Sequence, residues 1–195
     1  MIYLSSDLHF NHSREFVYKP RGFDSVEDMN IAIVNNFNSI VTPEDDLYLL
    51  GDLMLGQDME AGLELVRQLN GRIHIVRGNH DSDRRWEAYR ELPNVIETAA
   101  AIYLNYKKYH FYLSHFPTLT GNLEKESLKQ MTCNLFGHTH SKEHFFEDRP
   151  YMYNVAVDAH NCTPMLLDHI IVANDNTYSM IQHGDIDYRA RNNRS

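Results

Sequence analysis

Short apolar runs alternate with amphipathic segments through the first half of the chain, and this order restricts the fold more than any other feature. The apolar runs are residues 2–4, 47–50 and 73–76, and the amphipathic segments between them are residues 25–37 and 59–69. Runs of that length predict buried strands, and the apolar spacing of the segments predicts helices. Strand, helix, strand, helix, strand is the order of right-handed crossover units, so we expect a largely parallel sheet.

The pattern changes after residue 95. Shorter strands are expected at residues 95–96, 101–106, 109–113, 133–136, 151–157, 166–172 and 178–181, and helices at residues 83–90 and 123–131. The strands at 101–106 and 109–113 flank Lys107-Lys108 as the arms of a hairpin would. The chain has 195 residues and no linker-like segment, so we expect one domain over residues 1–195, with a two-sheet α/β core and helices outside.

Composition narrows the classes of function. The net charge of -9 argues against broad binding to nucleic acid or to an anionic membrane, because both need a cationic face. Cys133 and Cys162 lie far apart and form no metal or redox motif. No apolar run has the length of a membrane span, and the first strand begins too early for a signal peptide. We therefore expect a cytoplasmic protein, with residues 188–195 as a frayed, solvated terminus.

Five short polar motifs each follow a predicted strand. They are Asp7-Leu8-His9, Gly51-Asp52, Gly78-Asn79-His80-Asp81, Ser114-His115 and Gly137-His138-Thr139-His140. Strand ends in an open α/β sheet converge on one crevice, so these motifs are expected to meet in space. Their mixture of carboxylate, amide and imidazole suits a pair of borderline divalent ions, whereas calcium prefers oxygen ligands only. Asp7 and His9 can hold one ion together because residues i and i+2 point to the same side, and the lone Asp52 suits a bridging position.

The five motifs, in this order, resemble those of the calcineurin-like metallophosphoesterase superfamily, in the form of a small bacterial or phage member. The family pattern of D-x-H, G-D, G-N-H-[D/E], H and G-H-x-H occurs here without a substitution. The resemblance implies a four-layer α-β-β-α sandwich of two mixed sheets, with a dinuclear metal site at the strand ends. It assigns one ion to Asp7, His9, Asp52 and His140, and the other to Asp52, Asn79, His115 and His138. The ligand types leave the metal open among manganese, iron, zinc, nickel and cobalt.

The resemblance also implies a reaction, namely hydrolysis of a phosphate ester by a hydroxide that bridges the two metal ions. His80 is expected to bind the phosphoryl group or to act as the general acid, and Asp81 to hydrogen-bond the His80 ring. Outside the motifs, His12 is a candidate substrate contact in a loop near the crevice. Arg77 has two interpretations, a phosphate contact or a pairing with an acidic surface residue, and His160 is a candidate for the rim of the site.

The expected partner is a small phosphorylated substrate, with a phosphodiester or a nucleotide favoured. Two alternatives stay open: a catalytically silent binding or scaffold protein on the same fold, and a nuclease that uses the same metal site. A silent relative is expected to lose a ligand or the motif histidine, but Asn79 and His80 are both present. A nuclease needs a basic path for its polyanion, which the acidic balance disfavours. The sequence predicts neither the choice between monoester and diester nor the oligomeric state.

Overall fold

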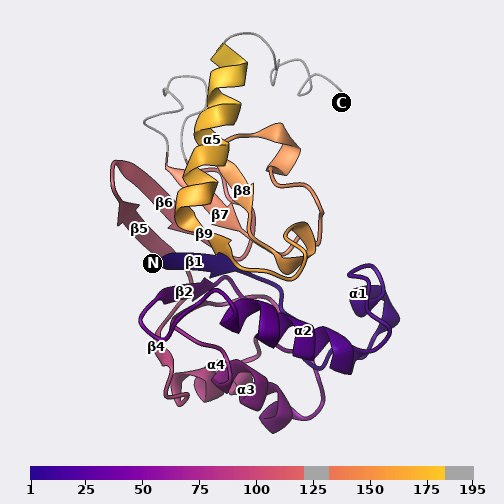
Figure 1. The fold of residues 1–195 in the computed structure, drawn as a ribbon. Helices are drawn as coiled ribbons and strands as arrows, with labels where there is room; N and C mark the ends of the chain where they lie inside the picture. The colour runs from indigo at the N-terminus through magenta and orange to yellow at the C-terminus, as the bar shows by residue number, and fades with distance from the viewer. Residues whose placement is uncertain (121–131, 183–195) are drawn as a thin grey trace.

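Two mixed β-sheets with flanking helices make up the computed structural model, which describes residues 1–120 and 132–182 (Figure 1). The first sheet has the strand order β4-β3-β2-β1-β9, formed by Val95–Ala99, Arg72–Val76, Asp46–Leu49, Ile2–Ser5 and Met165–Leu166. The second has the order β5-β6-β7-β8, formed by Ile102–Tyr106, Tyr109–Leu113, Cys133–Phe136 and Met152–Asn154. The prediction of an α/β fold with two mixed sheets and flanking helices is confirmed.

Strand direction follows the crossover order expected from the sequence. Strands β1 to β4 run parallel to one another, and the short β9 pairs antiparallel to β1. In the second sheet β5 and β6 form the predicted hairpin, while β6, β7 and β8 are parallel. The carboxyl ends of β1, β2 and β3 therefore lie along one edge of the first sheet, and those of β6 and β7 along one edge of the second.

Three helices cover one face of the first sheet: α2 (Val26–Asn38), α3 (Met59–Arg67) and α4 (Asp83–Arg90) (Figure 1). A side-chain oxygen caps each helix at its start, from Ser25, Asp58 and Ser82 respectively. A cap of this kind stabilises a helix by about 1 kcal/mol and fixes where it begins. The short helix α1 (Glu15–Tyr18) lies in the loop between β1 and α2.

The central strands β1, β2 and β3 of the first sheet are buried on both faces, which explains their mainly apolar sequences. Tyr3, Leu47 and Ile73 belong to a core shared with α2, α3 and α4. Their neighbours Leu4 and Tyr48 face the other way, into a second core between the two sheets. Helix α5 (Leu167–Gln182) lies on the opposite side of the first sheet from α2, α3 and α4 and packs against this second core (Figure 1).

The strands predicted at residues 166–172 and 178–181 are wrong, because residues 167–182 form α5 and only Leu166 belongs to a strand, β9. The β-branched run Ile170-Ile171-Val172 favours a strand by composition. Its burial has helical spacing instead, since Leu167, Ile170 and Ile171 are buried while Val172 is 56% exposed. The strand expected at 151–157 is shorter than predicted, with β8 at Met152–Asn154 followed by the 3-10 helix η3 (Val157–Ala159). A second 3-10 turn, η2, spans Phe146–Asp148.

Two further expectations concern segments outside the described residues, namely the helix at 123–131 and the frayed terminus at 188–195. Among the helices of the described segments, none combines the length and the apolar character that a bilayer span requires.

Candidate metal centre

The five polar motifs leave the carboxyl ends of β1, β2, β3, β6 and β7, and hydrogen bonds tie their loops together. The Asp7 N–H donates to the Gly51 carbonyl at 3.0 Å, and the Gly137 N–H donates to the His115 carbonyl at 3.0 Å. The two sheets are joined by the His138 N–H, which donates to Asp7 Oδ2 at 2.8 Å. Residues far apart in sequence therefore meet at one place, as expected from the strand ends.

Motif residues hold an uncommon backbone conformation. Left-handed φ angles of 58°, 50°, 55°, 69° and 49° occur at Asp7, His9, Asp52, His138 and His140. Only a few per cent of non-glycine residues adopt this region, and each such residue costs roughly 1–3 kcal/mol. Strain of this kind persists only where the surrounding structure imposes it, and it is concentrated at functional sites.

The motif glycines provide space for the carboxylates. A Cβ atom on Gly78 would lie 2.2 Å from Asp52 Oδ1, and one on Gly137 would lie 2.2 Å from Asp7 Oδ2. Both distances are far below van der Waals contact, so any side chain at these positions would displace a carboxylate. Glycine is required here because the backbone approaches the carboxylates so closely.

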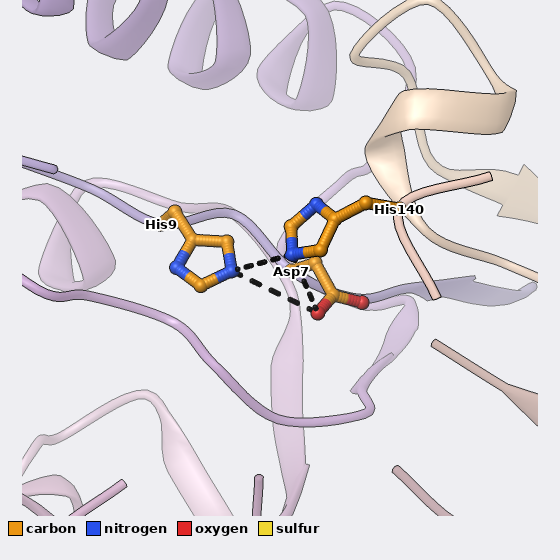
Figure 2. A group of neighbouring side chains, drawn as sticks. All are labelled: Asp7, His9 and His140. Carbon is orange, nitrogen blue, oxygen red and sulfur yellow. Dashed lines mark hydrogen bonds and ion pairs between the residues drawn. The ribbon is translucent and has the colours of Figure 1, made fainter. Parts of the chain in front are cut away.

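One cluster of ligand atoms comes from Asp7, His9 and His140 (Figure 2). His9 Nε2 lies 3.2 Å from His140 Nε2 and 3.8 Å from Asp7 Oδ1, and His140 Nε2 lies 3.9 Å from the same oxygen. Asp7 Oδ1 is buried and has no hydrogen-bond donor in the described part of the chain. A buried carboxylate oxygen without a donor is costly. A cation among these three atoms would remove that cost, so the residues fit a metal ion.

A second cluster comes from Asp7, Asp52 and His115. His115 Nε2 lies 3.4 Å from Asp52 Oδ2 and 2.8 Å from Asn79 Oδ1, while its Nδ1 lies 2.8 Å from the Leu50 carbonyl. The Leu50 and Asn79 oxygens only accept, so both ring nitrogens carry a proton in the metal-free protein. Burial acts to lower the pKa of His115, but the hydrogen bond to Asp52 and the charges of Asp7 and Asp52 hold it above its ordinary value. An ion bound at Nε2 would take the place of the proton there. The His138 ring packs edge-on against His115 with 5.0 Å between ring centroids.

Burial and mutual charge shift the pKa values of these groups. Burial raises the pKa of Asp7 and lowers the pKa of His9 to about 2. Burial also acts to raise the pKa of Asp52, but the hydrogen bond and charge of His115 hold it below its ordinary value. Burial lowers the pKa of His138. At neutral pH, His9 and His138 therefore keep uncharged rings, the form that binds a metal.

A buried ion pair orients His140, and the sequence analysis missed both of its members. Arg21, whose side chain is 2% exposed, donates to both carboxylate oxygens of Asp158 at 2.9 and 2.8 Å and to the Asp7 carbonyl at 2.9 Å. Asp158 Oδ2 in turn accepts from His140 Nδ1 at 3.0 Å. Burial acts to raise the pKa of Asp158, but the hydrogen bonds from His140 and Arg21 hold it well below its ordinary value. The Asp158 contact leaves His140 Nε2 facing Asp7 and His9.

His80 lies at the edge of the site, and Asp81 lies beneath it. The His80 N–H donates to Asp52 Oδ1 at 2.8 Å, and its 45% exposed ring places Nε2 4.0 Å from Asp52 Oδ2. Asp81 is buried and accepts from the N–H groups of Asp52 and Gly78 at 2.9 and 2.8 Å and from the Tyr89 hydroxyl at 3.0 Å. The expectation that Asp81 orients the His80 ring is therefore wrong. Asp81 holds the backbone of the two loops that carry Asp52 and Asn79.

His12 lies beside the ligand clusters, and its role as a substrate contact stays a prediction. Its ring centroid is 5.4 Å from that of His9, and its Nδ1 atom is buried without a hydrogen-bond partner among the described residues. Burial lowers the pKa of His12, with the charge of His80 as a further cause.

The other two substrate candidates, Arg77 and His160, both have partners within the protein. Arg77 donates to the carbonyl of Asp81, pairs with Asp83 of α4 and lies over the Trp86 ring. Of the two interpretations of Arg77, the structure therefore has the pairing with an acidic surface residue. His160 is buried with its ring between those of His144 and Tyr153, and its Nε2 donates to the Asn154 carbonyl at 2.7 Å. The contacts of His160 are those of a packed residue, because its polar atom is already satisfied by the backbone.

Comparisons with known proteins agree with this geometry. Residues 1–155 match the calcineurin-like phosphoesterase superfamily domain. An uncharacterized protein of Methanocaldococcus jannaschii is 34% identical over 175 residues, which cover 87% of this chain and 89% of that protein. The gene 66 protein of Mycobacterium phage L5 is 22% identical over 160 residues, covering 71% and 77%. The crystal structure of a protein of unknown function from Aquifex aeolicus has a TM-score of 0.67 and 26% identity, covering 87% and 97%. The domain match extends over most of the sequence, and the chain therefore belongs to the calcineurin-like phosphoesterase superfamily.

Proposed function

We propose that this protein is a phosphoesterase that uses two adjacent divalent metal ions to hydrolyse a phosphomonoester or phosphodiester, with a small phosphodiester or nucleotide favoured. The observation that carries the proposal is the pair of adjoining ligand clusters. Asp7 belongs to both clusters, and Asp52 Oδ2 lies 3.4 Å from His115 Nε2 and 3.9 Å from His9 Nε2. Two cations so close together repel each other, and carboxylates shared between them offset that repulsion.

The ligand sets follow from these contacts together with family membership. Asp7, His9, Asp52 and His140 would hold one ion, and Asp52, Asn79, His115 and His138 the other. The mixture of carboxylate, amide and imidazole donors suits manganese, iron, zinc, nickel or cobalt. The orphaned buried oxygen of Asp7 supports an ion at the first position, and the convergence of His115 Nε2 with Asn79 Oδ1 and Asp52 Oδ2 supports one at the second.

Bound ions would supply positive charge to the phosphoryl oxygens and would lower the pKa of a coordinated water toward neutrality. The protein side chains then have distinct tasks. His80, at the exposed edge of the site, would bind the phosphoryl group and donate a proton to the leaving oxygen. Asp81 keeps the Asp52 and Gly78 loops together, and Asp158 fixes the ring of His140.

The test is turnover of bis(p-nitrophenyl) phosphate and p-nitrophenyl phosphate by protein stripped of metal and reloaded with one ion type at a time. Wild-type protein should be active only when reloaded. His80→Asn should keep its metal and lose roughly 10²- to 10⁴-fold in kcat, the usual value of a general acid. His110→Asn is the matched control, since the exposed His110 ring of β6 contacts Asn105 in the hairpin.

Two results would contradict the proposal. Equal turnover by metal-free and reloaded protein would remove the ions from the reaction. Reloaded protein that hydrolyses neither ester with any of the metals would favour the silent binding protein on the same fold.

A further inference from the structure

A hollow of about 480 Å³ lies beside the candidate metal centre. Its walls are two loops, residues 11–14 and residues 55–57. The first loop begins two residues after His9, and the second begins three residues after Asp52. His12 joins the hollow to the metal centre. It lines the hollow, and its ring centroid lies 5.4 Å from that of His9, which belongs to the metal centre.

The walls of the hollow are held in place by hydrogen bonds. Asn11 and Asn30 of α2 exchange two of them, at 3.2 and 2.7 Å. Gly56 packs so closely on Asn11 that a Cβ atom on the glycine would lie 2.6 Å from the Asn11 Cβ. Arg85 donates to the carbonyls of Gly56 and His80, at 3.2 and 2.9 Å. The hollow is thus fixed relative to His80, the proposed general acid.

Arg14, on the wall of the hollow, is a cation without a partner. Arg14 is exposed, and its guanidinium makes no ion pair or hydrogen bond with the side chains that the structure describes, whereas those of Arg21, Arg72 and Arg77 pair with acids. The rest of the wall is mainly polar and includes the amides of Asn11 and Gln57 and the buried, unpartnered Nδ1 of His12. A free guanidinium among neutral hydrogen-bonding groups is suited to an anion rich in oxygen, above all a phosphate.

We infer that this hollow binds a second phosphate group of the substrate, carried on the same molecule as the ester that is hydrolysed. The inference rests on the proposed function. The volume falls within the range of roughly 300 to 1,000 Å³ seen for small-molecule sites, so it accommodates more than a phosphate alone. A sugar that links the two phosphates fits the remaining space and its polar wall. The substrate class is therefore a bisphosphate built on a sugar or nucleoside.

The experiment compares a nucleoside 3′,5′-bisphosphate with the corresponding 3′- and 5′-monophosphates as substrates of the metal-loaded protein. Wild-type protein should show a higher kcat/KM for the bisphosphate. Arg14→Gln should lower the ratio of the bisphosphate kcat/KM to the monophosphate kcat/KM by about 10- to 100-fold, the range expected for losing a hydrogen bond to a charged group. Arg84→Gln is the matched control: Arg84 is exposed on α4, has no polar partner among the described residues and lies outside the hollow.

Binding supplies a readout that does not depend on turnover. In the His80→Asn background, calorimetry should show that Arg14→Gln weakens bisphosphate affinity by a similar factor, while Arg84→Gln does not. Two results would overturn the second-phosphate site and leave the proposed function standing. One is ester hydrolysis without a preference for the bisphosphate, and the other is a bisphosphate preference and affinity that are unchanged in Arg14→Gln. Arg14-dependent binding in a protein that hydrolyses no ester would support the site and count against the proposed function alone.

Discussion

Replacing Asp158 by Asn is expected to weaken both the fold and the binding of metal. The Asp158 carboxylate accepts two hydrogen bonds from Arg21 and one from His140. Asn keeps one acceptor oxygen, loses the charge and places an NH₂ group where an oxygen accepts. The guanidinium of Arg21, at 2% exposure, would then lie buried without its counter-ion.

The size of each effect follows from burial. Breaking a buried ion pair from one side costs roughly 3–5 kcal/mol, and the oxygen that Asn retains places the expected loss near the lower end, about 3 kcal/mol. Removing the acceptor that orients a ligating histidine lowers metal affinity by roughly 10- to 100-fold. The depressed pKa of Asp158 means that its contribution is present above its ordinary pKa and is lost as the pH falls through the folded-state value. Measurements at pH 7 therefore register the full effect.

Two assays on the same samples separate the effects. Urea unfolding of the metal-free protein reports the stability loss, and competition with a chromophoric chelator reports metal affinity. Asp168→Asn is the matched control, since Asp168 forms its ion pair with Lys107 at the exposed surface. Wild-type stability and metal affinity in Asp158→Asn would refute the reasoning, as would equal losses in the two variants.

Three further outcomes are expected. Burial lowers the pKa of His160 to about 4, so the unfolded chain binds this proton at a higher pH than the folded protein does. As the pH falls from about 6.5 to 4, the metal-free protein should therefore lose up to about 3 kcal/mol of stability from this group. His160→Gln should flatten that slope in urea titrations, and an unchanged slope would contradict the assignment. Gly78→Ala should displace Asp52 and reduce metal content. Gly22→Ala strains a backbone φ of 88° but has open space around its Cβ, so it should cost stability and keep the metal; equal metal content in the two would argue against the close-approach explanation. Chelation should lower Tm, and added metal should restore it, because ions that bind only the folded state stabilise it; a Tm indifferent to chelator would oppose metal binding.

The parts of the fold and site that could be predicted are those encoded by local pattern. The strands before Asp7, Asp52 and Asn79 are buried on both faces, so their apolar runs and the polar residues at their ends are visible in the sequence. The expected meeting of the motifs follows from parallel strand direction alone. Helix α5 was misjudged because composition favoured a strand, while the burial of Ile170 and Ile171 has helical spacing.

Long-range contacts account for the rest. Arg21 and Asp158 are 137 positions apart, and neither lies in a pattern that indicates the other. Asp81 is adjacent to His80 in sequence, but the backbone directs its carboxylate under the Asp52 loop, where two N–H groups and the Tyr89 hydroxyl need an acceptor. Adjacency in sequence suggested the wrong partner because side-chain direction at a strand end depends on the neighbouring loops.

Metal content and turnover in Asp52→Asn, set beside wild type, test the central claim most directly. The proposed shared carboxylate predicts two divalent ions per wild-type chain and, in the variant, loss of at least one ion together with loss of phosphodiester turnover. Elemental analysis and the chromogenic assay on the same samples provide both values. Full activity in a metal-quantified Asp52→Asn sample would contradict the account.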